Sequence, residues 1–259
     1  MSAPPQVIIH HDADQLAKAV AARLVTRLVD AFAARGHASL VLTGGGIGTR
    51  VLAELAAEPA RDAVDWRHTD IWWGDERFVP AGDPDRNETG ARAALLDHLD
   101  TDPGRVHAMP GPDGPDGNNP EAAASRYAAW LRAAAAPEDH GQFPPFDILM
   151  LGIGPEGHVA SLFPGLPAVY EQDRSVLAVH DSPKPPPTRL TLTFPAIQAA
   201  REVWVLASGD DKADAVQMAL SGAAQVQVPA AGARGGQQTL FLVDRAAAAK
   251  IPSQLSHPT

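Results

Sequence analysis

The feature that most constrains the fold of this chain is the alternation of short apolar runs with segments of helical periodicity. Runs rich in Val, Leu and Ile predict strands over 39–43, 70–74, 146–152, 175–180, 189–194, 202–207 and 239–243. The segments between them predict helices over 49–58, 88–99, 120–135 and 211–221. Nearly continuous apolar strands that alternate with helices are typical of a parallel sheet covered on both faces. We therefore expect an α/β fold that binds its ligand at the carboxyl ends of the strands.

One further helix has the strongest sequence signal. Its apolar residues recur at every fourth position, at Leu16, Val20, Leu24, Leu28 and Phe32. Asp12 and Gln15 resemble a capping box at its start, and Gly36 is a typical stop. We predict a helix between Asp12 and Gly36.

Composition and charge narrow the class of protein. With 259 residues, 45% of them hydrophobic, the chain is long enough for one large domain, which we expect over residues 1–259. The formal net charge of -10 argues against a nucleic-acid partner, because such a partner requires a basic face. The absence of cysteine excludes disulfides, a thiolate nucleophile and Cys-ligated metal sites. No apolar run reaches membrane-spanning length and the start has no signal-peptide pattern, so we expect a cytoplasmic protein without a membrane partner.

The stretch "GIGPEGHVAS", residues 152–161, follows a predicted strand with three glycines and a histidine. Gly152, Gly154 and Gly157 match the pattern G-x-G-x-x-G of dinucleotide sites, but such a site also needs a long helix next. The continuation "HVASLFPGLP" contains too much proline and glycine for one. Glycines here instead let a ligand approach the backbone, and the amides of the turn form a concavity that binds an anion or an oxyanion.

His158 lies beside this concavity. An imidazole has an unperturbed pKa of about 6.5, so it exchanges protons at neutral pH and is suited to acid–base catalysis. The alternative is a hydrogen-bonded histidine with a purely structural role. No spacing in the sequence matches a metal-binding motif such as H-E-x-x-H, so we expect no metal ion.

A second glycine-rich loop occurs in "LVLTGGGIGTR", between a predicted strand and a predicted helix. Gly44, Gly45, Gly46 and Gly48 expose backbone amides at the positive end of the helix dipole, which is a common way to hold phosphate. The loop is not a Walker A motif, because G-K-[ST] is absent. The alternative is a tight strand-to-helix turn without a ligand.

Three basic residues are candidates for an anion site. Lys212 lies in the first turn of a predicted helix, where the dipole disfavours a cation unless an anion is near. Either Asp210 and Asp211 neutralise it, or it holds a substrate phosphate. Arg77 follows a predicted strand and Arg189 begins one, so both are candidates for the binding edge of the sheet. The alternative for Arg77 is a solvated loop.

Four motifs together resemble the 6-phosphogluconolactonase family, in order and over nearly the whole chain. They are "TGGGIGT", "WWGDERFVPAGDPDRNETGARAALL", "DILMLGIGPEGHVASLFPG", and "PKPPPTRLTLTFPAI" followed by "GDDKADAV". The resemblance implies a three-layer αβα sandwich with a mostly parallel, Rossmann-like sheet, similar to glucosamine-6-phosphate deaminase and ribose-5-phosphate isomerase. It also implies hydrolysis of the small-molecule substrate 6-phosphoglucono-δ-lactone in the oxidative pentose phosphate pathway, with no metal or organic cofactor.

The resemblance assigns roles by motif. It makes His158 the catalytic acid and base. The other residues form two groups, a rim of Asp75 and Arg77 and a phosphate site of Thr43, Gly44, Gly45, Gly46, Arg189 and Lys212. Backbone amides near His158 or the guanidinium of Arg77 are the candidates for stabilising an oxyanion.

Two positions depart from the usual pattern of the family. The first glycine-rich loop of the family commonly reads Ser-Gly-Gly-Ser-Thr-Pro. Because this chain has Gly46, Ile47 and Gly48 there, hydroxyl groups are lost, and backbone amides must supply more of the hydrogen bonds to the phosphate. The family usually has Asp before the Gly-His pair, where this chain has Glu156. Either Glu156 orients the imidazole with a different rotamer or through a bridging water, or Asp75 does so.

Two other functions are compatible with the same fold. A glucosamine-6-phosphate deaminase or isomerase is one, but Phe163 stands where deaminases of this fold use a glutamate. A sugar-phosphate-binding regulator without turnover is the other, but the chain has no spare segment for the helix-turn-helix domain that such proteins normally add. Ser161 lacks a nucleophile-elbow pattern, so we expect a packing or helix-turn hydroxyl there. For assembly we expect a monomer or a weak homo-oligomer.

Overall fold

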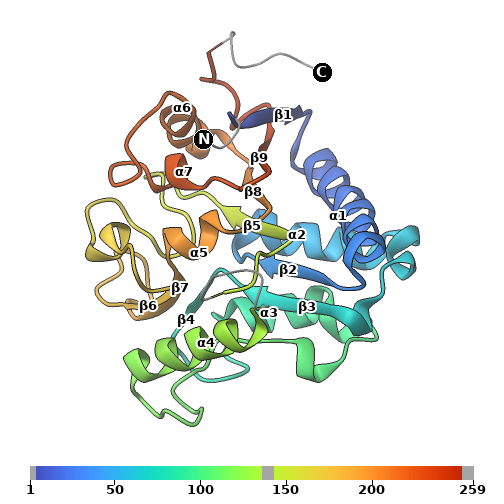
Figure 1. The fold of residues 1–259 in the computed structure, drawn as a ribbon. Coiled ribbons are helices and arrows are strands. Elements are labelled where there is room, and N and C mark those ends of the chain that lie inside the picture. Colours follow the sequence, from blue (N-terminus) through green and yellow to red (C-terminus); the bar gives the residue numbers. More distant parts are fainter. Residues whose placement is uncertain (1–3, 136–142, 253–259) are drawn as a thin grey trace.

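Six parallel strands form the central sheet of the computed structural model, which describes residues 4–135 and 143–252 (Figure 1). In the order in which they pair, the strands are β1 (Gln6–His10), β9 (Gln238–Asp244), β8 (Glu202–Ala207), β5 (Ile148–Gly152), β2 (Ala38–Leu42) and β3 (Thr69–Trp73). Every pairing in this sheet is parallel, which confirms the predicted α/β class. Residues 1–3, 136–142 and 253–259 of the domain predicted over 1–259 lie outside the described residues.

The neighbours β2 and β5 create the place where a ligand can bind. Within this sheet, the strand that follows β2 in the chain is β3, on one side of the pair, and the strands that follow β5 are β8 and β9, on the other side. Connections that run in opposite directions leave a crevice between the two strands at their carboxyl ends. Both glycine-rich loops begin there, and they touch, since the Gly152 N–H donates to Thr43 Oγ1 at 3.1 Å.

Helices flank the central sheet, as predicted. In chain order they are α1 (Ala13–Arg35), α2 (Gly45–Ala57), α3 (Asn87–Ala94), α4 (Pro120–Ala134), α5 (Phe194–Gln198), α6 (Ala213–Leu220) and α7 (Pro229–Gly232). α1 and α2 pack against each other and against strands of the sheet, to the right in Figure 1. None of the helices in the described ranges is long and apolar enough to cross a membrane.

The sequence signals of α1 are confirmed. Asp12 caps its first turn by accepting a hydrogen bond from the Gln15 N–H at 2.9 Å. Gly36 ends it in the left-handed conformation, with φ of 75°. Its apolar stripe from Leu16 to Leu28 is buried against the sheet.

Other element boundaries differ from the predicted ones. α2 begins at Gly45, so the first turn of the helix includes glycines that the prediction left in a loop, because glycine is a poor helix former. α6 begins only at Ala213, and Lys212 occupies its N-cap position at the end of a preceding 3₁₀ turn, without a capping hydrogen bond from its side chain. β1 was not predicted, because its five residues are exposed or half-buried at the sheet edge and form only a short apolar run. Short 3₁₀ helices occupy Pro59–Ala63, Trp66–His68, Leu96–His98, Pro103–Arg105, Pro167–Tyr170 and Asp210–Lys212.

A second, antiparallel sheet contains two of the runs that were expected in the parallel sheet. It contains β4 (Asp75–Arg77), β7 (Arg189–Leu192) and β6 (Val176–Val179), in that order. The runs 175–180 and 189–194 were expected in the parallel sheet. Their connection, residues 180–188, is too short for the crossover helix that parallel neighbours require, so the two strands form an antiparallel pair. We call this the small sheet, and residues 180–188 the proline loop; α4 packs against β6 and β7.

Gly74 joins the two sheets. Its N–H donates to the Leu42 carbonyl of the central sheet at 3.1 Å, and its own carbonyl accepts from the Leu192 N–H of the small sheet at 2.8 Å. The chain therefore passes directly from β3 into β4. This link places the charged residues of β4 beside the carboxyl ends of the central strands.

Candidate active site

A cavity of about 290 Å³ lies at the carboxyl ends of β2 and β5. Backbone from both glycine-rich loops lines it, through 43–45 and 152–154. The ionisable side chains that line it are Asp75, Arg77, His158, Lys184, Arg189 and Lys212. The structure therefore brings the predicted site residues together, except Gly46, which lines a neighbouring cavity, and Glu156, which contacts His158.

The first glycine loop, residues 43–46, presents an open backbone. Gly45 has φ of 78°, which only glycine adopts easily, and it begins α2. The first N–H groups of a helix have no partner within the helix. A Cβ at Gly44 would overlap the side-chain amide of Asn87, so glycine there also allows Asn87 to approach. These features support the expected anion-binding backbone.

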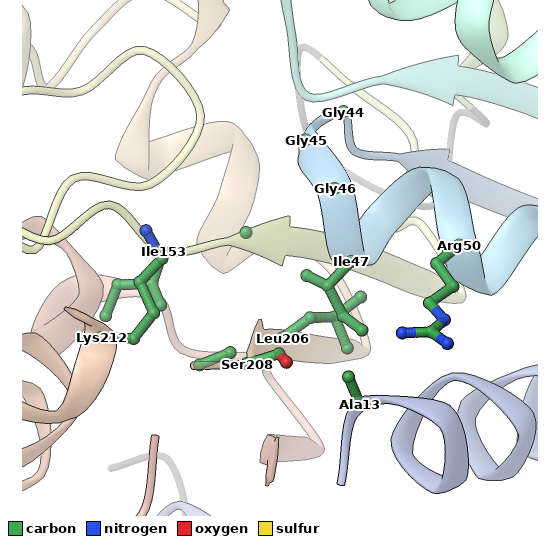
Figure 2. Close-up of a pocket in the computed structure, with 12 residues that line it drawn as sticks. Ala13, Gly44, Gly45, Gly46, Ile47, Arg50, Ile153, Leu206, Ser208 and Lys212 are labelled. Carbon is green, nitrogen blue, oxygen red and sulfur yellow. The ribbon is translucent and has the colours of Figure 1, made fainter. Parts of the chain in front are cut away.

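Figure 2 shows the neighbouring cavity of about 470 Å³, between the first turn of α2 and the end of β8. Lys212 and Arg50 lie on opposite sides of it, with Gly44, Gly45 and Gly46 at the start of the helix. Lys212 lines both cavities, and its Nζ is 2.8 Å from Asp211 Oδ2. The sequence left two alternatives for Lys212, and its side chain is both paired with Asp211 and placed at the cavities.

The second glycine loop, residues 152–158, is closed on itself. The Gly154 N–H donates to the His158 carbonyl, and the Gly157 N–H donates to the Gly154 carbonyl, both at 2.9 Å. Gly157 has φ of 88°. A Cβ at Gly154 would overlap the imidazole of His158. The loop thus fixes the histidine closely, and it uses two of the amides that we expected to face an oxyanion. No long helix follows, in agreement with the sequence.

His158 is held in a largely buried position. Its side chain is 15% exposed, and its ring lies 4.5 Å from that of Phe163. Burial and the nearby charge of Lys184 lower the pKa of His158 to about 4, although the carboxylates of Glu156 and Asp75 oppose this shift. The imidazole is therefore neutral at neutral pH, which is the form that accepts a proton.

Glu156 is the carboxylate next to the imidazole. Its Oε1 lies 3.1 Å from His158 Nδ1, an ion-pair distance, but among the described residues Nδ1 has no partner with hydrogen-bond geometry. Burial opposes ionisation of Glu156, but its own backbone N–H and the charges of His158 and Lys184 hold its pKa below the usual value. The longer side chain of glutamate thus reaches the ring directly.

Asp75 faces a different set of partners. It is buried and accepts a hydrogen bond from Ser161 Oγ at 2.7 Å. The Asn87 amide donates to the Asp75 carbonyl at 2.8 Å, and Arg189 Nη1 is 3.9 Å from the carboxylate. Ser161 was expected to be a packing or helix-turn hydroxyl, but it lies outside any helix and holds Asp75. Only tertiary contacts reveal this pair, since the two residues are far apart in sequence.

Arg77 and Asn87 form the rim of the cavity. Arg77 Nη1 donates to Asn87 Oδ1 at 2.7 Å and to the Asp85 carbonyl at 2.9 Å. The buried carboxylate of Glu76 accepts from the N–H groups of Asn87 and Glu88 and so fixes the start of α3. Sequence reasoning missed Asn87, although its position at the start of a helix after a charged stretch is a usable signal.

Arg189 is turned mainly towards the proline loop. Its Nη2 donates to the carbonyls of Lys184 and Pro185 at 3.0 and 3.1 Å, and its Nε donates to the Pro186 carbonyl at 3.2 Å. The residue is 4% exposed. Most of its donors therefore hold the loop, and Nη1 is left near Asp75 at the cavity.

The described part of the chain contains no group of three or more His, Asp or Glu side chains that could hold a metal ion. The two lysines of the cavity instead pair with carboxylates beside it, Lys184 with Glu156 and Lys212 with Asp211.

Comparisons of sequence and fold with known proteins identify one family. The chain belongs to the family described as glucosamine-6-phosphate isomerases/6-phosphogluconolactonase, which matches residues 11–242. It is 59% identical over 258 residues to a Streptomyces coelicolor protein named 6-phosphogluconolactonase, covering 100% of this chain and 99% of that protein. It is 53% identical over 245 residues to a Mycobacterium tuberculosis protein of the same name, covering 95% and 98%. The structure resembles that of 6-phosphogluconolactonase from Trypanosoma brucei, with a TM-score of 0.81, 29% identity, and coverage of 96% and 99%.

Proposed function

We propose that this chain hydrolyses 6-phosphoglucono-δ-lactone to 6-phosphogluconate, the second step of the oxidative pentose phosphate pathway. Relatives that are 59% and 53% identical carry the name of this enzyme. The observation that carries the proposal is the position of His158 at the cavity, with Glu156 Oε1 3.1 Å from its Nδ1. Opening a lactone requires a base for the attacking water and an acid for the departing ring oxygen, and one imidazole supplies both.

We assign the phosphate of the substrate to the first glycine loop. The unpartnered amides at the start of α2 and the helix dipole favour an anion there. Lys212 faces the same loop across the cavity and adds a positive charge. Arg189 contributes Nη1 and otherwise holds the proline loop in place.

The reaction then takes place at His158. Neutral His158 accepts a proton from water as the water oxygen bonds to C1, and the carbonyl oxygen becomes an oxyanion. When the carbonyl re-forms, the bond between C1 and the ring oxygen breaks, and the imidazolium gives its proton to that oxygen. The new carboxylic acid releases its own proton to solvent. Glu156 stabilises the imidazolium, and Asp75 and Arg77 shape the rim.

The test is an assay with freshly prepared lactone. Purified protein should form 6-phosphogluconate faster than buffer does, measured through a coupled 6-phosphogluconate dehydrogenase. A rate equal to spontaneous hydrolysis would contradict the proposal, and tight product binding without turnover would favour a regulator. Ammonia release from glucosamine 6-phosphate would favour the deaminase, although the buried Phe163 offers no carboxylate for that reaction.

The compartment, assembly and cofactor requirement of the enzyme are also proposed. We place its action in the cytoplasm, as a monomer or weak homo-oligomer that uses no metal or organic cofactor and binds neither nucleic acid nor membrane. Light scattering over a range of protein concentrations tests the assembly. A mass that stays at a large oligomer on dilution would contradict this part.

A further inference from the structure

The cavity contains a cation to which no sequence motif gave a role. Lys184 lies in the proline loop and lines the same cavity as His158. Its Nζ is 3.2 Å from Glu156 Oε2, and the other oxygen of that carboxylate is 3.1 Å from His158 Nδ1. Lys184 therefore lies at the His158 end of the cavity, whereas Lys212 also lines the neighbouring cavity next to the first glycine loop.

The backbone that carries Lys184 is tightly held. Its carbonyl accepts from Arg189 Nη2 and from Ser182 Oγ, both at 3.0 Å. Arg189 also holds the next two carbonyls of the loop. The Lys184 side chain, in contrast, is 41% exposed. A fixed backbone with a partly exposed ammonium allows the side chain to change partner without moving the loop.

Several other donors at this end of the cavity are already engaged. The N–H groups of Gly154 and Gly157 donate within their own loop, and Pro155 has no N–H. Arg77 Nη1 donates to Asn87 and to a backbone carbonyl. In the described residues, the Lys184 ammonium is paired with one carboxylate, that of Glu156. Because that carboxylate also lies next to His158 Nδ1, Lys184 is placed to receive a charge that forms near His158.

We propose that Lys184 binds the negative charge that forms at C1 of the substrate, first on the oxyanion and then on the product carboxylate. The inference rests on the proposed function and adds a residue to it. The lactone is neutral at C1, so Lys184 stays with Glu156 while the substrate binds. As water adds, C1 gains an oxyanion and His158 becomes an imidazolium. Lys184 then turns to the oxyanion, and the released Glu156 faces the imidazolium, so each charge has a partner at each stage.

A comparison of two ligands distinguishes binding of the charge at C1 by Lys184 from a general attraction of Lys184 for anions. 6-Phosphogluconate carries a phosphate and a carboxylate. D-Sorbitol 6-phosphate has the same chain and phosphate but a neutral hydroxymethyl group at C1. Isothermal titration calorimetry at low salt measures the affinity of the parent protein and of each variant for both ligands.

The parent should bind 6-phosphogluconate about tenfold more tightly than D-sorbitol 6-phosphate, because a hydrogen bond to a charged group contributes about that factor. Lys184→Gln should remove this preference and leave the affinity for D-sorbitol 6-phosphate within about twofold, which also shows that the variant is folded. Lys184→Arg should restore much of the preference. Lys212→Gln is the matched control, and it should weaken both ligands by the same factor, since both carry the phosphate.

One alternative needs its own variant. Without Lys184, the unpaired carboxylate of Glu156 could repel the product carboxylate and produce the same loss. In the double variant Lys184→Gln/Glu156→Gln that repulsion is absent. If Lys184 binds the carboxylate directly, the double variant still shows no preference for 6-phosphogluconate.

A preference regained in the double variant overturns the inference, as does a parent protein that binds both ligands equally. In the second case lactone hydrolysis above the buffer rate would leave the proposed function intact. Conversely, a preference that depends on Lys184 without any lactone turnover supports the charge site and contradicts the proposed function.

Discussion

The two glycine loops of the cavity use glycine for opposite reasons. At Gly45 and Gly46 an added Cβ would meet nothing within 4 Å, so the first loop is open where α2 begins, although Gly44 is packed against Asn87. At Gly154 an added Cβ would overlap the ring of His158, so the second loop is crowded. The first begins a helix and presents backbone, whereas the second is closed on itself and presents a side chain.

This difference indicates which part of the reaction each loop is suited to. An open backbone binds a group that is the same in substrate and product, such as a phosphate, and such binding lowers KM without raising kcat. A crowded loop fixes the position of an imidazole, and position matters most in the transition state. Changes in the first loop and its cations should therefore act on KM, and changes in the second should act on kcat.

The largest effect should come from the second loop. In His158→Ala we expect kcat to fall by about 10²–10⁴, the usual contribution of general acid–base catalysis, with KM nearly unchanged. The exposed His37→Ala is the control and should behave like the parent. Steady-state assays must subtract spontaneous hydrolysis. Near-parental kcat in His158→Ala would show that the histidine is structural and that the contrast between the loops is wrong.

The next largest effect on kcat should appear when one methyl group is added to each loop and the two variants are compared. Gly154→Ala should displace the imidazole and lower kcat by about 10²-fold, because a small misplacement of a catalytic group is costly. Gly46→Ala, where the space is open, should leave kcat within about twofold. Circular dichroism and thermal melts show whether both variants fold. Equal losses of kcat would mean that crowding around His158 has no part in catalysis.

The contrast between the loops was partly predictable, because its signals are local. Glycines after an apolar run mark a turn with special backbone needs, and the caps Asp12 and Gly36 mark the ends of α1. These patterns depend on residues a few positions apart. They predicted both loops, the parallel pairing of the central strands, and His158 as the side chain that one loop presents.

Contacts between distant segments were not predictable. Ser161 holds Asp75 from another part of the chain, and Lys184 meets Glu156 through a loop that the sequence marks only as rich in proline. The direction in which Arg189 points depends on which carbonyls surround it after folding. The small sheet was missed for a related reason, since apolar runs do not state the direction in which strands pair.

The first loop and its cations should give smaller effects, seen in KM. Lys212→Gln should raise KM for the lactone by roughly tenfold to a hundredfold, because a contact from a charged group to phosphate is worth about 1.5–3 kcal/mol. Arg189→Gln should also raise KM, and it should lower the free energy of unfolding by about 1–3 kcal/mol, because carbonyls of the proline loop lose their donor. Steady-state kinetics measures the change in KM, and urea unfolding measures the change in the free energy of unfolding. Unchanged KM in both variants would contradict the assignment of the substrate phosphate to this end of the cavity.

The smallest effect concerns pH and the neighbours of His158. The pKa of His158 is lowered from 6.5 to about 4, mainly by burial and to a smaller extent by the charge of Lys184. The acid limb of kcat/KM should therefore lie well below pH 6.5. Arg77 and Arg189 also line this cavity, and Glu156 and Asp75 oppose the shift.

The lowered pKa of His158 should also make the free energy of unfolding depend on pH. In the unfolded chain His158 takes up its proton near pH 6.5, but in the folded chain only near pH 4, so unfolding binds a proton between these values. The free energy of unfolding should therefore decrease as pH falls through this window, and less so in His158→Ala. Thermal melts at a series of pH values measure the difference between the two proteins.

Substitution of each neighbour gives the sharpest form of this prediction, because the two should act in opposite directions. Lys184→Gln removes a positive charge and should raise the pKa of His158, which moves the acid limb to higher pH. Glu156→Gln removes a negative charge and should move the limb to lower pH, whatever it does to the maximal rate. NMR titration of the His158 ring measures the same pKa without turnover. A limb that moves the same way in both variants, or that does not follow the NMR titration, would show that another group titrates and that the second loop does not supply the base.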